Sequence, residues 1–184
     1  MHEFVQFFNI GRQHIADVRS IDHILLITAL CIRYLFTDWK KVVILITAFS
    51  IGNVVAMLLS TFNIVHLSNR WIEFLIPLSI ILTAVTNVFV RKFVYKHSYP
   101  PIYFLALIFG LIHGLGLFRH YTLLQQLAFN VGIEVGQLFI VLCILLLTFI
   151  CVNVFKVNRR EYILFLSGGV LAVAVQLALQ RIPF

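Results

Sequence analysis

The sequence predicts an all-α membrane protein in which six transmembrane helices follow an interfacial amphipathic helix. Two observations predict this fold class. Hydrophobic residues make up 61% of the 184 residues and charged residues only 11%, whereas about 25% of an ordinary soluble domain is charged. The apolar residues are gathered in six runs, and about 20 apolar residues cross a bilayer as one helix. The chain therefore has no room for a separate soluble domain.

The first 20 residues predict the interfacial helix, because Phe4, Phe7 and Phe8 are mixed with the charged Arg12 and Asp17. Each apolar run that follows is taken as one span, with the ranges 21–36, 42–60, 72–90, 102–118, 127–155 and 162–179. The predicted organisation is an N-terminal interfacial helix, residues 1–20, followed by a single six-helix transmembrane bundle, residues 21–184.

The net charge of +7 is carried mostly by residues beside the apolar runs, so we expect a lipid bilayer and no nucleic acid as the partner. The loops after the first, third and fifth spans hold Lys40, Lys41, Arg91, Lys92, Lys96, Lys156, Arg159 and Arg160. The loops after the second and fourth spans hold only Arg70 and Arg119. Because Lys and Arg are retained on the cytoplasmic side, we expect both termini outside the cytoplasm, in a bacterial inner membrane.

Ionisable residues at membrane depth are the main functional signal, because each costs about 2.5–3.5 kcal/mol at a helix centre and needs a partner or a role. Asp22 and His23 open the first span, Glu73 opens the third, His113 lies in the fourth and Glu134 in the fifth. In the predicted orientation all of them belong to one outer layer. His14, which shares a helix face with Asp17, is a further candidate near this layer. We therefore predict a metal site that faces outward.

Two glycine pairs flank the candidate ligands. Gly110 and Gly114 bracket His113, and Gly132 and Gly136 bracket Glu134. Such spacings let helix backbones approach closely, so we expect the fourth and fifth spans to pack together and to bring His113 to Glu134. Imidazole beside carboxylate suits Ni, Co, Zn, Fe or Cu better than Ca or Mg.

Structural explanations of the same residues stay open. His113 and Glu134 could form a buried ion pair, Asp22 could cap a helix, and Glu73 could interact with a helix dipole. Four amides either line a polar path and support the ligands or join helices by hydrogen bonds: Asn53, Asn87, Asn130 and Gln137.

Four sequence elements together resemble the HupE/UreJ family of hydrogenase and urease accessory membrane proteins. They are Gln13-His14-Ile15 leading to Ile21-Asp22-His23, Trp71 to Pro77, Phe109 to Gly116, and Phe129 to Gln137. The resemblance implies a helical bundle for nickel or cobalt uptake. Carried over by motif, metal handling falls on His14, Asp22, His23, Glu73, His113 and Glu134. The chain departs from similar proteins at Asn53, where they carry a histidine, and at Ser20, where they carry a glycine.

These observations predict a divalent metal permease of the nickel or cobalt type. The alternative is an intramembrane metalloenzyme, a hydrolase, in which the same cluster activates water and Glu134 or Glu73 serves as base. A purely structural or partner-binding role is the third hypothesis. It explains the glycine pairs but not the four converging ionisable groups.

Overall fold

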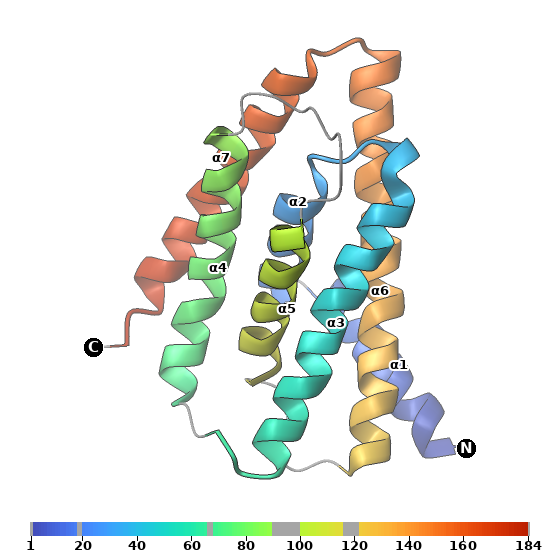
Figure 1. Ribbon diagram of the computed structural model, residues 1–184, viewed down its shortest axis with the longest axis vertical. Helices are drawn as coiled ribbons and strands as arrows, with labels where there is room; N and C mark the ends of the chain where they lie inside the picture. The colour runs from blue at the N-terminus through green and yellow to red at the C-terminus, as the bar shows by residue number, and fades with distance from the viewer. Residues whose placement is uncertain (1, 18–19, 66–67, 90–99, 116–121, 184) are drawn as a thin grey trace.

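The computed structural model describes residues 2–17, 20–65, 68–89, 100–115 and 122–183 (Figure 1). These residues form helices and, within the described ranges, no strand. The α-helices are α1 (His2–Ala16), α2 (Ile21–Cys31), α3 (Trp39–Thr61), α4 (Asn69–Phe89), α5 (Pro100–Leu115), α6 (Leu123–Phe149) and α7 (Arg159–Gln180). A 3-10 turn, η2 (Phe36–Asp38), precedes α3, and a π-helical turn, η3 (Ile150–Val154), extends α6. The all-α prediction is thus confirmed for the described chain.

Four helices are long and apolar enough to cross a membrane: α3 with η2, α4, α6 with η3, and α7. The predicted first and fourth spans are shorter helices, because α2 has 11 residues and α5 has 16. At 1.5 Å per residue, α2 covers about 16 Å, roughly half of a hydrocarbon core. Residues 116–118 of the predicted fourth span lie outside the described residues. The structure thus supports an integral membrane protein, and six full spans remain a prediction.

The helix α1 lies against α6, and in Figure 1 it rises along the N-terminal half of α6 towards the middle of the molecule. A Cβ on Gly11 would come closer than 3.0 Å to the Phe129 carbonyl oxygen, and one on Gly132 equally close to the Phe8 carbonyl oxygen. The backbones of α1 and α6 can approach this closely because both positions are glycine and carry no side chain. Helix α1 is therefore packed on the bundle, and a position flat at the membrane interface remains a prediction.

The other glycine pair packs α5 on α3. A Cβ on Gly110 would meet the Phe49 carbonyl oxygen closer than 3.0 Å, and a Cβ on Gly52 would do the same at Leu107. The predicted packing of the Gly110/Gly114 segment on the Gly132/Gly136 segment is therefore wrong. Gly110 instead packs against Gly52 of α3, and Gly132 packs against the backbone of α1 at Phe8, because a residue without a side chain lets two helix backbones approach closely.

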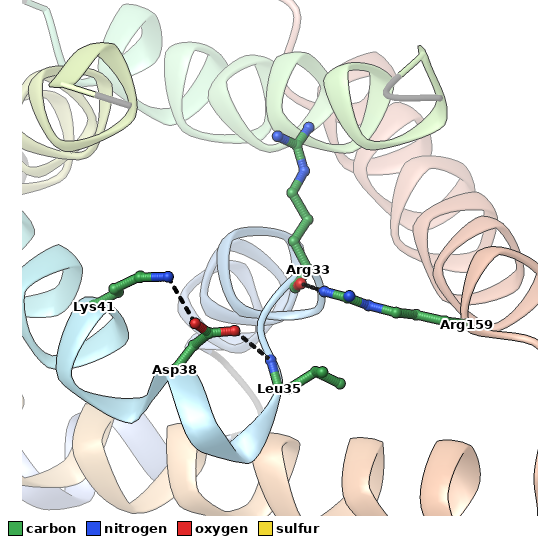
Figure 2. Close-up of polar contacts among 5 residues, drawn as sticks. All are labelled: Arg33, Leu35, Asp38, Lys41 and Arg159. Atoms are coloured by element: carbon green, nitrogen blue, oxygen red, sulfur yellow. Dashed lines mark hydrogen bonds and ion pairs between the residues drawn. The ribbon is translucent and has the colours of Figure 1, made fainter. Parts of the chain in front are cut away.

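The C-terminal end of α2 is held by its neighbours. The Asn87 amide of α4 donates to the Ala29 carbonyl at 2.7 Å and accepts from Arg33 Nε, and Arg33 also donates to the Thr86 hydroxyl at 2.9 Å. Figure 2 shows Arg159, at the start of α7, reaching the Arg33 carbonyl at 2.5 Å. These bonds fix α2 between α4 and α7, and they show Asn87 as a link between helices.

Candidate functional site

The site begins where α1 ends and α2 starts. His14 lies in the last turn of α1, and Asp22 and His23 lie in the first turn of α2. The His14 and His23 rings meet edge to face, with 5.4 Å between centroids and 76° between planes. The Ser20 hydroxyl lies 3.5 Å from His14 Nδ1. The break between the two helices thus brings two imidazoles together.

Helix α5 adds the third imidazole. The His113 ring lies 5.2 Å from the His23 ring, at 68°, and 5.3 Å from the Phe49 ring of α3. Its Nδ1 lies 2.8 Å from the Phe109 carbonyl. Because a carbonyl can only accept, Nδ1 carries the proton, and Nε2 keeps its lone pair. His113 therefore presents an unprotonated nitrogen inside the bundle.

The three imidazoles of His14, His23 and His113 form a line of ring contacts, which we call the histidine row. Asp22 adds a carboxylate to this row. Its Oδ2 accepts a hydrogen bond from Arg181 Nη1 at 2.7 Å, and the two side chains form an ion pair. The other oxygen, Oδ1, is buried without a hydrogen-bond partner among the described residues. Arg181 follows the last residue of α7. In the sequence it is one basic residue near the end of an apolar run, so nothing indicated its contact with Asp22.

Buried polar atoms without partners are concentrated at this site. Within the described residues they include both ring nitrogens of His23, Nε2 of His113, Oδ1 of Asp22 and both amide atoms of Asn53. Burying such atoms unpaired costs about 1–3 kcal/mol each. Imidazole lone pairs and a carboxylate oxygen are donors for a transition-metal cation, so the residue types fit the metal predicted from the sequence.

The arrangement is a row and not a closed ligand shell. Among the described residues, no group of three or more His, Cys, Asp or Glu side chains is arranged to hold a metal ion. The rings contact each other by their edges and faces. The described side chains are therefore neighbouring imidazoles and a carboxylate that have not closed around a metal ion.

The row lies level with the middle of α3. His113 contacts Phe49, which lies half way along α3, one of the four long apolar helices. In Figure 1, α2 also begins near the middle of the molecule. The site therefore lies near the centre of the bundle. Asp22 and His23 open an apolar run, which predicts a place at the outer face, and in the structure α1 precedes them along the N-terminal half of α6. Their position at the outer face of a membrane remains a prediction.

Glu134 and Glu73 have other surroundings. Glu134 is half-buried, and its Oε1 accepts a hydrogen bond from the Thr47 hydroxyl of α3 at 3.0 Å. Glu73 lies in the second turn of α4 with an exposed side chain. The structure thus brings together His14, Asp22, His23 and His113, and it places Glu134 on the contact between α3 and α6.

This contact carries a line of polar side chains, which we call the α3–α6 seam. It pairs Thr47 with Glu134, Ser50 with Gln137, Met57 with Asn130 and Thr61 with Gln126. The Ser50 hydroxyl donates to Gln137 Oε1 at 3.4 Å, and Asn130 Nδ2 lies 2.6 Å from Met57 Sδ. Asn130, Glu134 and Gln137, which are spaced i, i+4 and i+7 along α6, thus all face α3. Thr47 and Gln126 complete the seam.

Comparison with known protein families identifies the family of this chain. A family model described as HupE / UreJ protein matches residues 1–181. The chain belongs to the HupE/UreJ family. The match confirms the resemblance predicted from the motifs, and it extends over all the α-helices found in the described residues of this HupE/UreJ protein, from α1 to α7. Comparisons with curated proteins and with solved structures returned no match.

Proposed function

We propose that this HupE/UreJ protein binds a divalent transition metal of the nickel or cobalt type and carries it across the membrane. The observation that supports this most directly is the contact of three imidazoles at the break between α1 and α2. Both ring nitrogens of His23 and Nε2 of His113 have no hydrogen-bond partner among the described residues, and they lie beside an acidic side chain in an otherwise apolar bundle. The cation is the cargo of the protein.

The central ligands in this proposal are His23, His113 and Asp22, and His14 is the next ligand along the row. His113 is already in the required tautomer, because the Phe109 carbonyl holds the proton on Nδ1 and leaves the lone pair of Nε2 available. The three side chains come from two helices, and His14 from a third. Changes in side-chain rotamer, together with a small tilt of α1 against α2, would turn the row into a ligand set.

Short helices that meet near the middle of a membrane are suited to transport, since their ends can move while the long helices stay packed. From the histidines, the α3–α6 seam offers Ser50, Gln137, Thr47 and Glu134 as weaker ligands towards the end of the bundle that holds Arg33 and Arg159. Weak successive sites favour release of a permeating ion. In this proposal Glu134 acts after the histidines, and Glu73 is an exposed charge that attracts cations at the start of α4.

The test is metal flux into proteoliposomes that contain a metal-sensitive dye. The wild-type protein should accelerate entry of Ni²⁺ or Co²⁺, and Glu134→Gln should slow it while binding at the histidines is retained. His2→Ala, at the exposed start of α1, is the matched control and should transport like the wild type. If no first-row divalent cation enters although the protein binds one firmly, the permease is rejected. No observation favours the intramembrane hydrolase, and we do not propose it.

A further inference from the structure

The ion pair between Asp22 and Arg181 joins the candidate metal site to the end of the last helix. Arg181 Nη1 lies 2.7 Å from Asp22 Oδ2, and the side chains are 26% and 10% exposed, respectively. Asp22 neighbours His23 in the same turn of α2, and His23 contacts His113. The guanidinium thus brings a full positive charge to the group of side chains that would receive a cation.

The charges of Asp22 and Arg181 affect how the site can bind a divalent cation. With Arg181 in place, the negative charge of Asp22 is compensated and the site is electrically neutral. A divalent cation that entered beside the guanidinium would be repelled at short range in a medium of low dielectric constant. The single negative charge of Asp22 cannot compensate the Arg181 guanidinium and a divalent cation at the same time. Binding of the metal and binding of the guanidinium are therefore opposed.

The position of Arg181 allows its side chain to move away from the Asp22 carboxylate. It lies beyond Gln180 at the C-terminal cap of α7, with φ −113° and ψ 20°, outside the helical conformation. Its backbone N–H bonds to the Ala178 carbonyl at 3.2 Å, so the backbone stays anchored when the side chain moves. Because the Arg181 side chain is partly exposed and has several rotatable bonds, its charged head can turn away from Asp22.

We propose that Arg181 is the resident counter-charge of Asp22, and that an incoming divalent cation displaces its guanidinium from the carboxylate. The exchange keeps a positive charge beside Asp22 at every stage, so the buried carboxylate is never left uncompensated. Arg181 then lowers the affinity for the cargo and assists its release by returning. This inference rests on the proposed function and adds a residue that sets its affinity.

The test is calorimetric titration of the full-length protein in lipid nanodiscs with Ni²⁺, Co²⁺ or Zn²⁺ alone. Arg181→Gln removes the charge and keeps an amide for hydrogen bonding, so it should bind metal at least about tenfold more tightly. Arg181→Lys retains the charge and should stay close to the wild type. Arg160→Gln removes an exposed arginine in the first turn of α7 and should change the affinity less than about twofold. In an Asp22→Asn background, Arg181→Gln should have no further effect.

The outcomes separate this inference from the proposed function. If the wild type binds metal and Arg181→Gln binds equally or less tightly, the exchange is wrong and the metal site stands. If Arg181→Gln binds metal and the wild type does not, the exchange is supported in its strongest form. If neither protein binds any of the three metals while both unfold at similar temperatures, the proposed function fails and the exchange fails with it.

Discussion

The imidazoles of His23 and His113 meet edge to face with 5.2 Å between ring centroids, although they belong to α2 and α5. This contact depends on two shorter apolar helices, which have 11 and 16 residues in the described part of the chain. Both lie among the longer helices of the bundle.

We expect His23→Ala and His113→Ala each to weaken binding of Ni²⁺ or Co²⁺ by about 100-fold or more, because each removes a ligand and opens the geometry of the others. Calorimetric titration of the purified proteins measures this change. His2→Ala, which removes an exposed histidine from the same chain, should bind like the wild type. Full metal occupancy in both site variants would mean that the histidine row has only a structural role.

We expect Gly110→Ala to lower the free energy of unfolding by about 1–3 kcal/mol, because its Cβ would overlap the Phe49 carbonyl and push α5 away from α3. Gly168→Ala in α7 is the matched control, since no atom lies within 4 Å of its Cβ position. That substitution should be neutral or slightly stabilising through its higher helix propensity. Unfolding in mixed micelles, followed by circular dichroism, measures both. Equal stability of the two variants would contradict the close contact of α3 and α5.

We expect Asn53→His to bind metal about tenfold more tightly, because it places a fourth imidazole beside the row. Asn53 is fully buried, its amide has no hydrogen-bond partner among the described residues, and its backbone packs on Gly114, which follows His113. The same titration, repeated with Ni²⁺, Co²⁺ and Zn²⁺, shows whether the preference among metals changes. Weaker binding with intact folding would show that position 53 is remote from the ligands.

Much of this arrangement follows from local sequence. The apolar runs place the long helices, and the cost of burying ionisable groups singles out Asp22, His23 and His113 before any contact is known. Partners are harder to predict, because a glycine pair marks a face that allows close approach and says nothing about which helix uses it. Gly110 therefore gave no indication of Gly52, and Gly132 gave none of Gly11.

Contacts between distant segments were the least predictable part of the site. Glu134 was expected to meet His113 through the glycine pairs, and its hydrogen bond to Thr47 follows from the true packing of α6 on α3. Arg181 reaches Asp22 from the opposite end of the chain. In the sequence, only the positive charge of Arg181 could have indicated its contact with Asp22, since a buried carboxylate needs a positive partner.

The shortness of α2 also bears on how the protein enters the membrane during synthesis. A segment of 11 apolar residues is too short to be retained in a bilayer as an independent span, and it carries Asp22 and His23 at its start. Helices α4 and α6, which contact it, are made later. We therefore expect α2 to reach its final depth only after these helices have been synthesised, so that the histidine row is assembled at the end of biogenesis and not at its beginning.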